Sequence, residues 1–434
     1  IEPERDRSKI DEPIDPPDDP IRDDTIEVEA PVAPEDFSED AGDPDLPAGP
    51  FEGKGESVWM GPGGGAKGGG GPRFGSPPPL KDRPAPTEAL RATDAALRWL
   101  ARHQSPDGRW DCDDFERHCK GQRCGGPGGP LHDPGVSGLA LLAFLGAGET
   151  HRGGTHASTV RQGLRYLVHA QDAEGCFGPR TGGNFVYDHA IAALAMSEAY
   201  AITQSPLFRR SAQSGIDFVH ACRNPYAAWR YGVRPQDNDT SVTGWMVMAL
   251  KSAASGGLAV DPAAFEGAVA HLDRVTEPEY GRAGYTMRGN GPSRPAELMD
   301  RFPADRSESM TAVAVLTRVF CGAKSGDPFV RKGADLLLRC LPVHDEAAGS
   351  VDHYYWYYGS LAMFQVGEEP WKRWRVAMEK AILGSQRLAE GDDRHGSWDP
   401  VDPWGREGGR VYSTAINALS SEVYYRHARV FGIR

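Results

Sequence analysis

From about residue 86 to the C-terminus, apolar residues recur with helical spacing, and two kinds of helical segment alternate. Segments of the first kind have one apolar and one polar face, and they span 87–103, 157–171, 207–222, 262–274, 328–340 and 371–388. Segments of the second kind are apolar nearly all round, and they span Val136–Gly146, Tyr187–Ala201, Thr240–Ala254, Ser309–Cys321, His353–Gln365 and Tyr412–Tyr425. A helix that is apolar on every side is buried on every side, so we expect the second kind inside and the first outside. Since no period-2 strand pattern accompanies them, the sequence predicts an all-α domain over residues 86–434.

A repeated signature links the end of an outer segment to the loop after it. Ala96–Trp110 has an aromatic residue at +3, Leu at +4, Gln at +8, Gly at +12 and an aromatic residue at +14, and Gly163–Phe177 keeps this spacing. Later copies are weaker, although Gln386 and Trp398 return in the last one. We expect the Gln side chain to bond free carbonyls at the end of its own helix and to stack on the aromatic residue. Six such hairpins form an open solenoid or a closed ring, and six fully apolar helices favour an α6/α6 toroid with a central cavity.

The Gln…Gly-x-Trp pattern resembles the QW repeat of squalene–hopene cyclases and of protein prenyltransferase β subunits, over residues 86–434. Residues 239–245 (DTSVTGW) and 352–359 (DHYYWYYG) look like a bacterial branch of this superfamily that has a single toroid and is often membrane-anchored. The resemblance implies a toroid whose cavity binds an isoprenoid or other apolar ligand. It is specific for the fold and weak for activity, because the repeat is structural.

The family's catalytic acid can be matched to this sequence in two registers. Class II terpene cyclases protonate an alkene with the third residue of an Asp-x-Asp-Asp-Thr-Ala motif at the start of an inner helix, and Asp237-Asn238-Asp239-Thr240-Ser241 has a similar layout. One register makes Asp239 the acid, with Asp237 as the first aspartate of the motif. The other places Asn238 there, and an amide cannot protonate an alkene. Asp239 would also be a good N-cap, so catalysis and capping alone both stay open.

The loop after the first signature holds a second group of candidates. Its literal D-x-D-D, Asp111-Cys112-Asp113-Asp114, precedes no inner helix, and we interpret it as an acidic loop cluster. Cys112, His118, Cys119 and Cys124 could bind zinc, or Cys119 and Cys124 could form a disulfide in an exported protein, or the thiols could be free. No Cys-x-x-Cys pair is present. The resemblance to protein prenyltransferases implies a zinc-binding His as the fourth residue of an Asp-x-Tyr-His motif, and Tyr355 occupies that position here. We therefore expect no cofactor.

The starts of the inner helices would meet at one mouth of a toroid. Polar and aromatic candidates for the cavity lie there, namely Asp188, His189, Trp245, Glu308, Asp352, His353, Tyr354, Tyr355 and Trp356. Aromatic faces can stabilise a carbocation or bind a ring-shaped or cationic ligand, whereas the alternative is that these groups only cap helices and fill the core. Residues 354–358 are five consecutive aromatics, which cannot all face one way, and we expect this segment to form a cavity wall.

Three functions therefore remain open. The first is a terpene-cyclase-like domain that binds an isoprenoid or other apolar ligand, with or without catalysis. The second is a non-catalytic binding or scaffold domain on a tether. The third is a carbohydrate-active (α/α)6 enzyme, which would need a carboxylate pair from the acidic residues named above.

The N-terminal part has a different composition. Residues 1–50 are rich in Asp, Glu and Pro, and 61–79 are rich in Gly, so we expect residues 1–85 to be a disordered tail and linker. Such a stretch would suit a spacer from a membrane anchor ahead of Ile1, with the toroid outside the cytoplasm. A net charge of −13 argues against a nucleic-acid partner, because phosphate binding needs a basic face. No run of about 20 apolar residues is present to span a membrane.

Overall fold

The computed structural model describes residues 88–426 except 293 and 325. Within these residues the regular structure is helical, and the only β pairing is two isolated bridges, Gln171 with Phe177 and Thr276 with Ala283. No helix of the described part is long and apolar enough to cross a membrane. The expected tail and linker, residues 1–85, and the last eight residues of the expected toroid lie outside the described residues.

The helices fall into two alternating sets, as the pattern of apolar positions predicted. The outer set is α1 (Glu88–Arg102), α3 (Ala157–Ala170), α5 (Pro206–Cys222), α7 (Ala263–Val275), α9 (Pro328–Arg339) and α11 (Glu368–Leu383). The inner set is α2 (Asp133–Gly146), α4 (Phe185–Thr203), α6 (Thr240–Ser255), α8 (Ser309–Phe320), α10 (His353–Val366) and α12 (Gly405–Arg426). Three short 3-10 turns lie in two loops: η2 (Phe115–His118) between α1 and α2, and η3 (Ala296–Leu298) and η4 (Ala304–Arg306) between α7 and α8. Helix α12 is kinked at Gly409, whose φ of 63° is not helical.

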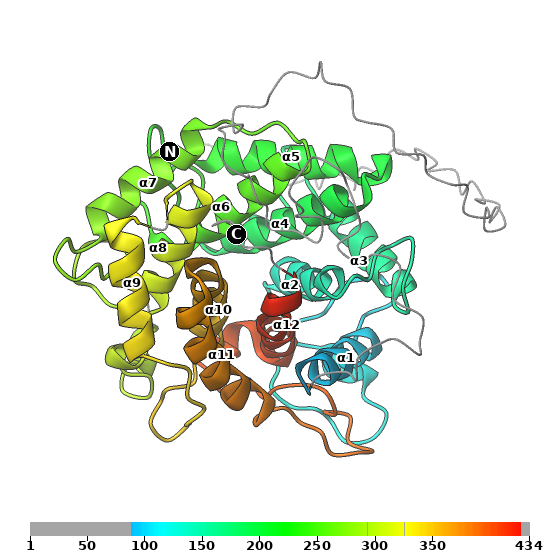
Figure 1. The fold of residues 1–434 in the computed structure, drawn as a ribbon. Helices are drawn as coiled ribbons and strands as arrows, with labels where there is room; N and C mark the ends of the chain where they lie inside the picture. The colour runs from blue at the N-terminus through cyan, green and yellow to red at the C-terminus, as the bar shows by residue number, and fades with distance from the viewer. Residues whose placement is uncertain (1–87, 293, 325, 427–434) are drawn as a thin grey trace, which may run out of the picture. The chain divides into compact units, whose positions relative to one another are not determined.

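The inner helices form a closed ring. Each packs against the next from α2 round to α12, and α12 packs back against α2 and α1 (Figure 1). The outer helices surround this ring, and each one packs against two neighbouring inner helices. The closing contact between α12 and α2 excludes the open solenoid, and the fold is an α6/α6 toroid.

The repeat residues connect neighbouring hairpins, which differs from the role we expected for the Gln. Its side-chain Nε2 donates to the loop Gly and to a carbonyl of the next outer helix: Gln104 to Gly108 O (2.8 Å) and Thr159 O (3.0 Å), Gln171 to Gly175 O (3.0 Å) and Ser211 O (3.0 Å), Gln386 to Gly396 O (3.0 Å) and Ala92 O (2.8 Å). The Gln386 contact joins α1 to the end of the last outer helix and completes the ring.

The tryptophans of the repeat donate to carbonyls at the end of the outer helices. Trp110 Nε1 donates to Leu100 O (2.8 Å), and Trp398 Nε1 donates to Ile382 O (2.8 Å). Both indoles are fully buried. The prediction that Gln would bond these carbonyls was therefore wrong. The indole N–H donates to them instead, and the Gln amide donates to the next outer helix.

The repeat glycine is required by the backbone. Gly108, Gly175 and Gly396 have φ values of +96°, +94° and +96°, in the region that favours glycine. A Cβ on them would lie 2.2, 2.1 and 2.2 Å from a backbone oxygen of the next outer helix. The loop can therefore approach that helix closely only where the side chain is absent.

Candidate functional site

A central cavity of about 130 Å³ lies at the N-terminal ends of the inner helices. All six inner helices contribute to its wall, with side chains from the loops that precede them. The apolar part is formed by Val136, Leu139, Ile191, Trp245, Met310, Trp404 and the ring of Tyr412. The toroid topology thus brings the starts of six sequence-distant helices to one site, as expected.

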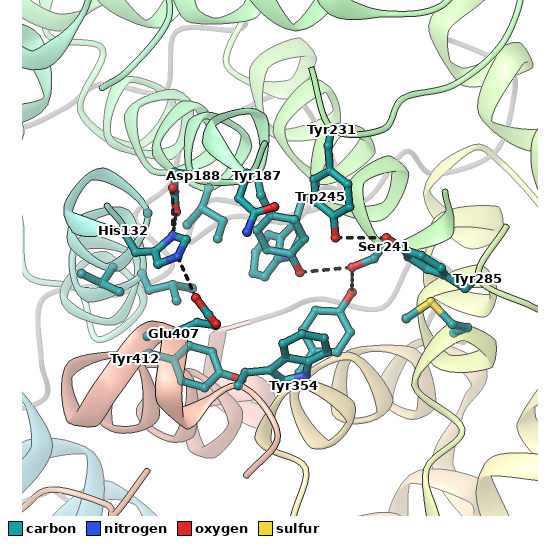
Figure 2. A pocket seen from close by; sticks show the side chains of 18 residues that line it. His132, Tyr187, Asp188, Tyr231, Ser241, Trp245, Tyr285, Tyr354, Glu407 and Tyr412 are labelled. Carbon is teal, nitrogen blue, oxygen red and sulfur yellow. Dashed lines mark hydrogen bonds and ion pairs between the residues drawn. The ribbon is translucent and has the colours of Figure 1, made fainter. Parts of the chain in front are cut away.

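One side of the cavity carries a chain of charged groups centred on His132 (Figure 2). Its Nδ1 lies 3.1 Å from Asp188 Oδ2, and its Nε2 lies 3.2 Å from Glu407 Oε2. The hydrogen bond to Asp188 raises the pKa of His132 to about 9, against the opposing effect of burial. His132 is therefore an imidazolium at neutral pH. Burial raises the pKa of Asp188, and the imidazolium beside it favours its ionised form.

The opposite side carries neutral hydroxyl groups. Ser241 Oγ lies 2.8 Å from Tyr354 Oη and 3.2 Å from Tyr187 Oη, and Trp245 Nε1 donates to Tyr187 Oη at 2.8 Å (Figure 2). Burial raises the pKa of both Tyr187 and Tyr354, so neither phenol ionises near neutral pH. This side offers hydrogen bonds without a net charge.

Asp239, the candidate acid, lies behind the cavity wall. It is fully buried, and its Oδ1 accepts a hydrogen bond from Val242 N (2.7 Å), which caps α6. Tyr285, which does line the cavity, donates to Asp239 Oδ2 at 3.4 Å. Burial raises the pKa of Asp239 to about 7. The capping role is therefore present in the structure, and Tyr285 stands between this carboxyl and the cavity.

The neighbours of Asp239 have other contacts. Asp237 forms an exposed ion pair with Arg230. Asn238 Oδ1 accepts from Asn224 Nδ2 and Ala228 N, both at 3.0 Å, which fixes the loop. Neither of the two registers of the acid motif places its third residue on the cavity surface.

Of the other predicted cavity residues, the structure places Asp188, Trp245 and Tyr354 in the wall. The rest lie elsewhere, each with its own contacts. His189 bridges Phe177 N (3.1 Å) and Gly215 O (3.1 Å), and burial lowers its pKa to about 3.

Glu308 and Asp352 are paired with arginines away from the cavity wall. Glu308 binds Arg282 (2.6 Å), and Asp352 binds Arg294 (2.6 Å) while its Oδ1 caps α10. The remaining three predicted residues are packed in the core, namely His353, Tyr355 and Trp356. Only one of five consecutive aromatics, Tyr354, lines the cavity, because the helix turns the others toward its neighbours.

Sequence reasoning missed Glu407, Tyr231 and Tyr285, which line the cavity, and it did not predict the ion pairs of His132. His132 was visible as an inner-helix start, but nothing in the pattern paired it with Asp188. Glu407 lies before the kink in α12, ahead of the expected helix. Tyr231 and Tyr285 lie in loops, where no periodicity applies, and their hydroxyls are 3.0 Å apart.

The cysteine-rich loop does not bring together the four residues proposed as zinc ligands. The Cys112 thiol donates to Glu407 O (3.2 Å), and His118 Nε2 lies 3.3 Å from Ser105 Oγ. Cys119 and Cys124 have their sulfur atoms 3.3 Å apart, and no disulfide is present among the described cysteines. These two thiols lie instead beside His103, which follows α1.

No family model matches this chain, and no curated protein matches it. Several solved structures do match this chain. A type II terpene cyclase from Scytonema, in complex with geranylgeranyl dihydroxybenzoate, is 14% identical, with a TM-score of 0.50, and the match covers 78% of this chain and 97% of the cyclase. The toroid is what they share. An alpha-amylase from Clostridium perfringens is 8% identical with a TM-score of 0.52, covering 79% of this chain and 99% of the amylase. An alpha-1,6-mannanase of a Salegentibacter species is also 8% identical with a TM-score of 0.52, and the match covers 78% of this chain and 100% of the mannanase. At these identities the likeness is one of fold, and it includes a terpene cyclase as well as an amylase and a mannanase.

Proposed function

We propose that the toroid binds an apolar small molecule, of isoprenoid type or carrying a hydrocarbon ring, in the central cavity. The observation that supports this most directly is the cavity lining, which is mostly aromatic and aliphatic with a few convergent polar groups. Such a lining is typical of sites for apolar ligands and cofactors. The aromatic faces of Trp245 and Tyr354 would contact the ligand, and the Ser241 hydroxyl would orient a polar group on it.

The cavity volume limits how much of the ligand is enclosed. About 130 Å³ is close to the ~150 Å³ of an engineered protein cavity that takes one benzene molecule. Sites for drug-sized ligands usually measure about 300–1,000 Å³. We therefore expect the cavity to hold one ring or one end of a chain, with the rest of the ligand leaving past Glu407, whose side chain is 55% exposed.

The positions of the acidic groups favour binding over cyclisation. Protonation of an alkene needs a carboxylic acid at the substrate, and Asp239 is screened by Tyr285. His132 is an imidazolium whose pKa of about 9 makes it a weak proton donor. A pKa of about 7 does keep part of Asp239 in its acid form, so a cyclase reaction is the second candidate. It would require Tyr285 to move aside.

The carbohydrate alternative would use the two carboxylates beside His132. Both of them already contact the imidazolium, which leaves neither free to act as a nucleophile or to hold a proton for a leaving group. The apolar wall of the cavity would also leave sugar hydroxyls without hydrogen-bond partners.

Binding is tested by titrating the full chain with farnesol, geranylgeraniol and alpha-1,6-mannotriose. Calorimetry measures affinity, and the fluorescence of the cavity tryptophans reports the site. We expect saturable binding of a polyprenol, which Ile191→Phe removes by filling the cavity. Leu194→Phe, buried in the same helix and absent from the cavity wall, is the matched control and should keep binding. Binding of the trisaccharide alone would support the sugar function, and binding of neither class would support a scaffold.

Catalysis is tested in the same samples by mass spectrometry of extracted ligand. Asp239→Asn preserves a good helix cap while removing the acid. A product formed by the unchanged protein and lost in Asp239→Asn would establish the cyclase reaction. Unaltered ligand in both samples would leave binding as the function.

A further inference from the structure

A second cluster of chemically active side chains lies apart from the central cavity. His103 directly follows α1, and Cys119 and Cys124 lie in the loop between η2 and α2. His103 Nε2 is 3.6 Å from Cys119 Sγ and 3.5 Å from Cys124 Sγ, and the two sulfur atoms are 3.3 Å apart. None of the three side chains lines the cavity.

These separations are close to the edges of a tetrahedral zinc site. Zinc–sulfur bonds of about 2.3 Å and zinc–nitrogen bonds of about 2.0 Å imply sulfur–nitrogen edges of about 3.6 Å and a sulfur–sulfur edge of about 3.8 Å. The two sulfur–nitrogen distances already match, and the sulfur atoms would separate by about half an ångström. The thiols are in contact and not bonded, so both are available to an ion.

The histidine is held in the form that a metal needs. Its Nδ1 lies 2.8 Å from Trp99 O, a carbonyl that can only accept, so Nδ1 carries the proton and the Nε2 lone pair faces the sulfur atoms. The Trp99 indole stacks on the imidazole with ring centroids 4.1 Å apart, which fixes the ring orientation.

We propose that His103, Cys119 and Cys124 bind a Zn²⁺ ion, with the fourth position taken by solvent beside the half-buried Cys119. Binding forms two zinc–sulfur bonds and one zinc–nitrogen bond, and it releases both thiol protons to solvent. The two cysteines are spaced Cys-x4-Cys, and the third ligand comes from the end of a helix, 16 residues before Cys119, so the sequence pattern did not reveal the set.

The position of the cluster indicates a structural role. The loop that carries both cysteines contacts the last hairpin, since Gly121 N donates to Asp393 Oδ2 (2.6 Å) and Arg410 Nε donates to Gly125 O (2.8 Å). An ion there would fasten this loop to α1, at the seam where the first hairpin of the ring meets the last.

The test uses the full chain, reduced and freed of metal, and titrated with Co²⁺ and then Zn²⁺. We expect one equivalent of Co²⁺ to give a thiolate-to-cobalt charge-transfer band, which Zn²⁺ abolishes by displacement. Cys119→Ser and Cys124→Ser should each weaken binding by more than about 100-fold, since loss of a direct ligand should exceed the effect of an outer-shell change. Cys321→Ser changes another half-buried thiol, remote in sequence, and should bind normally.

Alkylation gives a readout that does not depend on the variants folding. Zn²⁺ should protect Cys119 of the unchanged protein from iodoacetamide and should leave Cys321 as reactive as before. The proposal is overturned if the reduced, folded protein gives no charge-transfer band, or if Zn²⁺ protects neither Cys119 nor Cys124. It is also overturned if a Cys119–Cys124 disulfide forms and its reduction yields no metal binding.

Discussion

The close approach of the repeat glycine to the next outer helix can be isolated by a pair of matched substitutions. Gly175 and Gly232 have almost the same φ, +94° and +95°. They differ in surroundings. A Cβ on Gly175 would lie 2.1 Å from Ser214 O and 2.7 Å from Ser214 C, whereas a Cβ on Gly232 would meet nothing within 4 Å. Gly232→Ala therefore measures the conformational term alone.

The expected losses follow from these two environments. An L-residue at positive φ costs about 1–2 kcal/mol, and this term applies to both alanines. Only Gly175→Ala must also push a helix backbone away, and overpacking of this kind costs about 1–3 kcal/mol. Moving α5 would also strain the Gln171 hydrogen bond to Ser211 O. We expect Gly232→Ala to lower the free energy of unfolding by about 1–2 kcal/mol and Gly175→Ala to lower it by about 2–5 kcal/mol.

The measurement is urea unfolding followed by circular dichroism, with the free energy of unfolding compared at an unchanged slope. Gly175→Ala should also unfold at a distinctly lower temperature than Gly232→Ala. Equal losses for the two variants would refute the reasoning, because they would show that the contact with α5 does not require a glycine.

Three further changes test other features of the toroid. Gln386→Ala should lower the free energy of unfolding by about 1–3 kcal/mol, because it removes two buried hydrogen bonds. The exposed Gln162→Ala should change it by less than about 0.5 kcal/mol in urea unfolding. The pKa of His132 is raised to about 9 by Asp188, so its contribution to stability is complete below about pH 6.5 and is lost as the pH rises through 9. The urea midpoints of the unchanged protein and of His132→Gln should accordingly converge by about pH 10, and a constant gap would contradict the pairing. Burial raises the pKa of Asp239 to about 7, so its ionised form opposes folding above that pH, and Asp239→Asn should match or exceed the stability of the unchanged protein at pH 8.

The fold could be predicted because the periodicity of apolar positions shows which helices are buried and which have one polar face. Uniformly apolar segments are buried on every side, and six of them favour a closed arrangement. The weak fourth copy shows the limit of this reasoning. Thr276, Gly281 and Ala283 form the same bridge and close approach as Gln171, Gly175 and Phe177, but one extra residue in the loop hides the spacing.

The site was less predictable because it depends on which way each side chain points. Topology placed the inner-helix starts together, and Asp188 does reach the cavity. Asp239 begins its helix in the same way, yet its carboxyl turns toward the backbone to cap it. A loop residue, Tyr285, then occupies the wall instead. The partner of Cys119 and Cys124 was hidden for a related reason, since a local loop motif cannot reveal a ligand from another element.

The hydrogen bond between Gln386 and Ala92 joins residues 294 positions apart. A chain made from its N-terminus therefore completes the last hairpin long after α1 has formed, and the face of α1 that receives Gln386 stays uncovered during synthesis. An open solenoid could become stable repeat by repeat, whereas this ring gains its final contacts only when its ends meet. Its folding should accordingly be slow and all-or-none, and chains stopped before residue 386 should depend on chaperones to remain in solution.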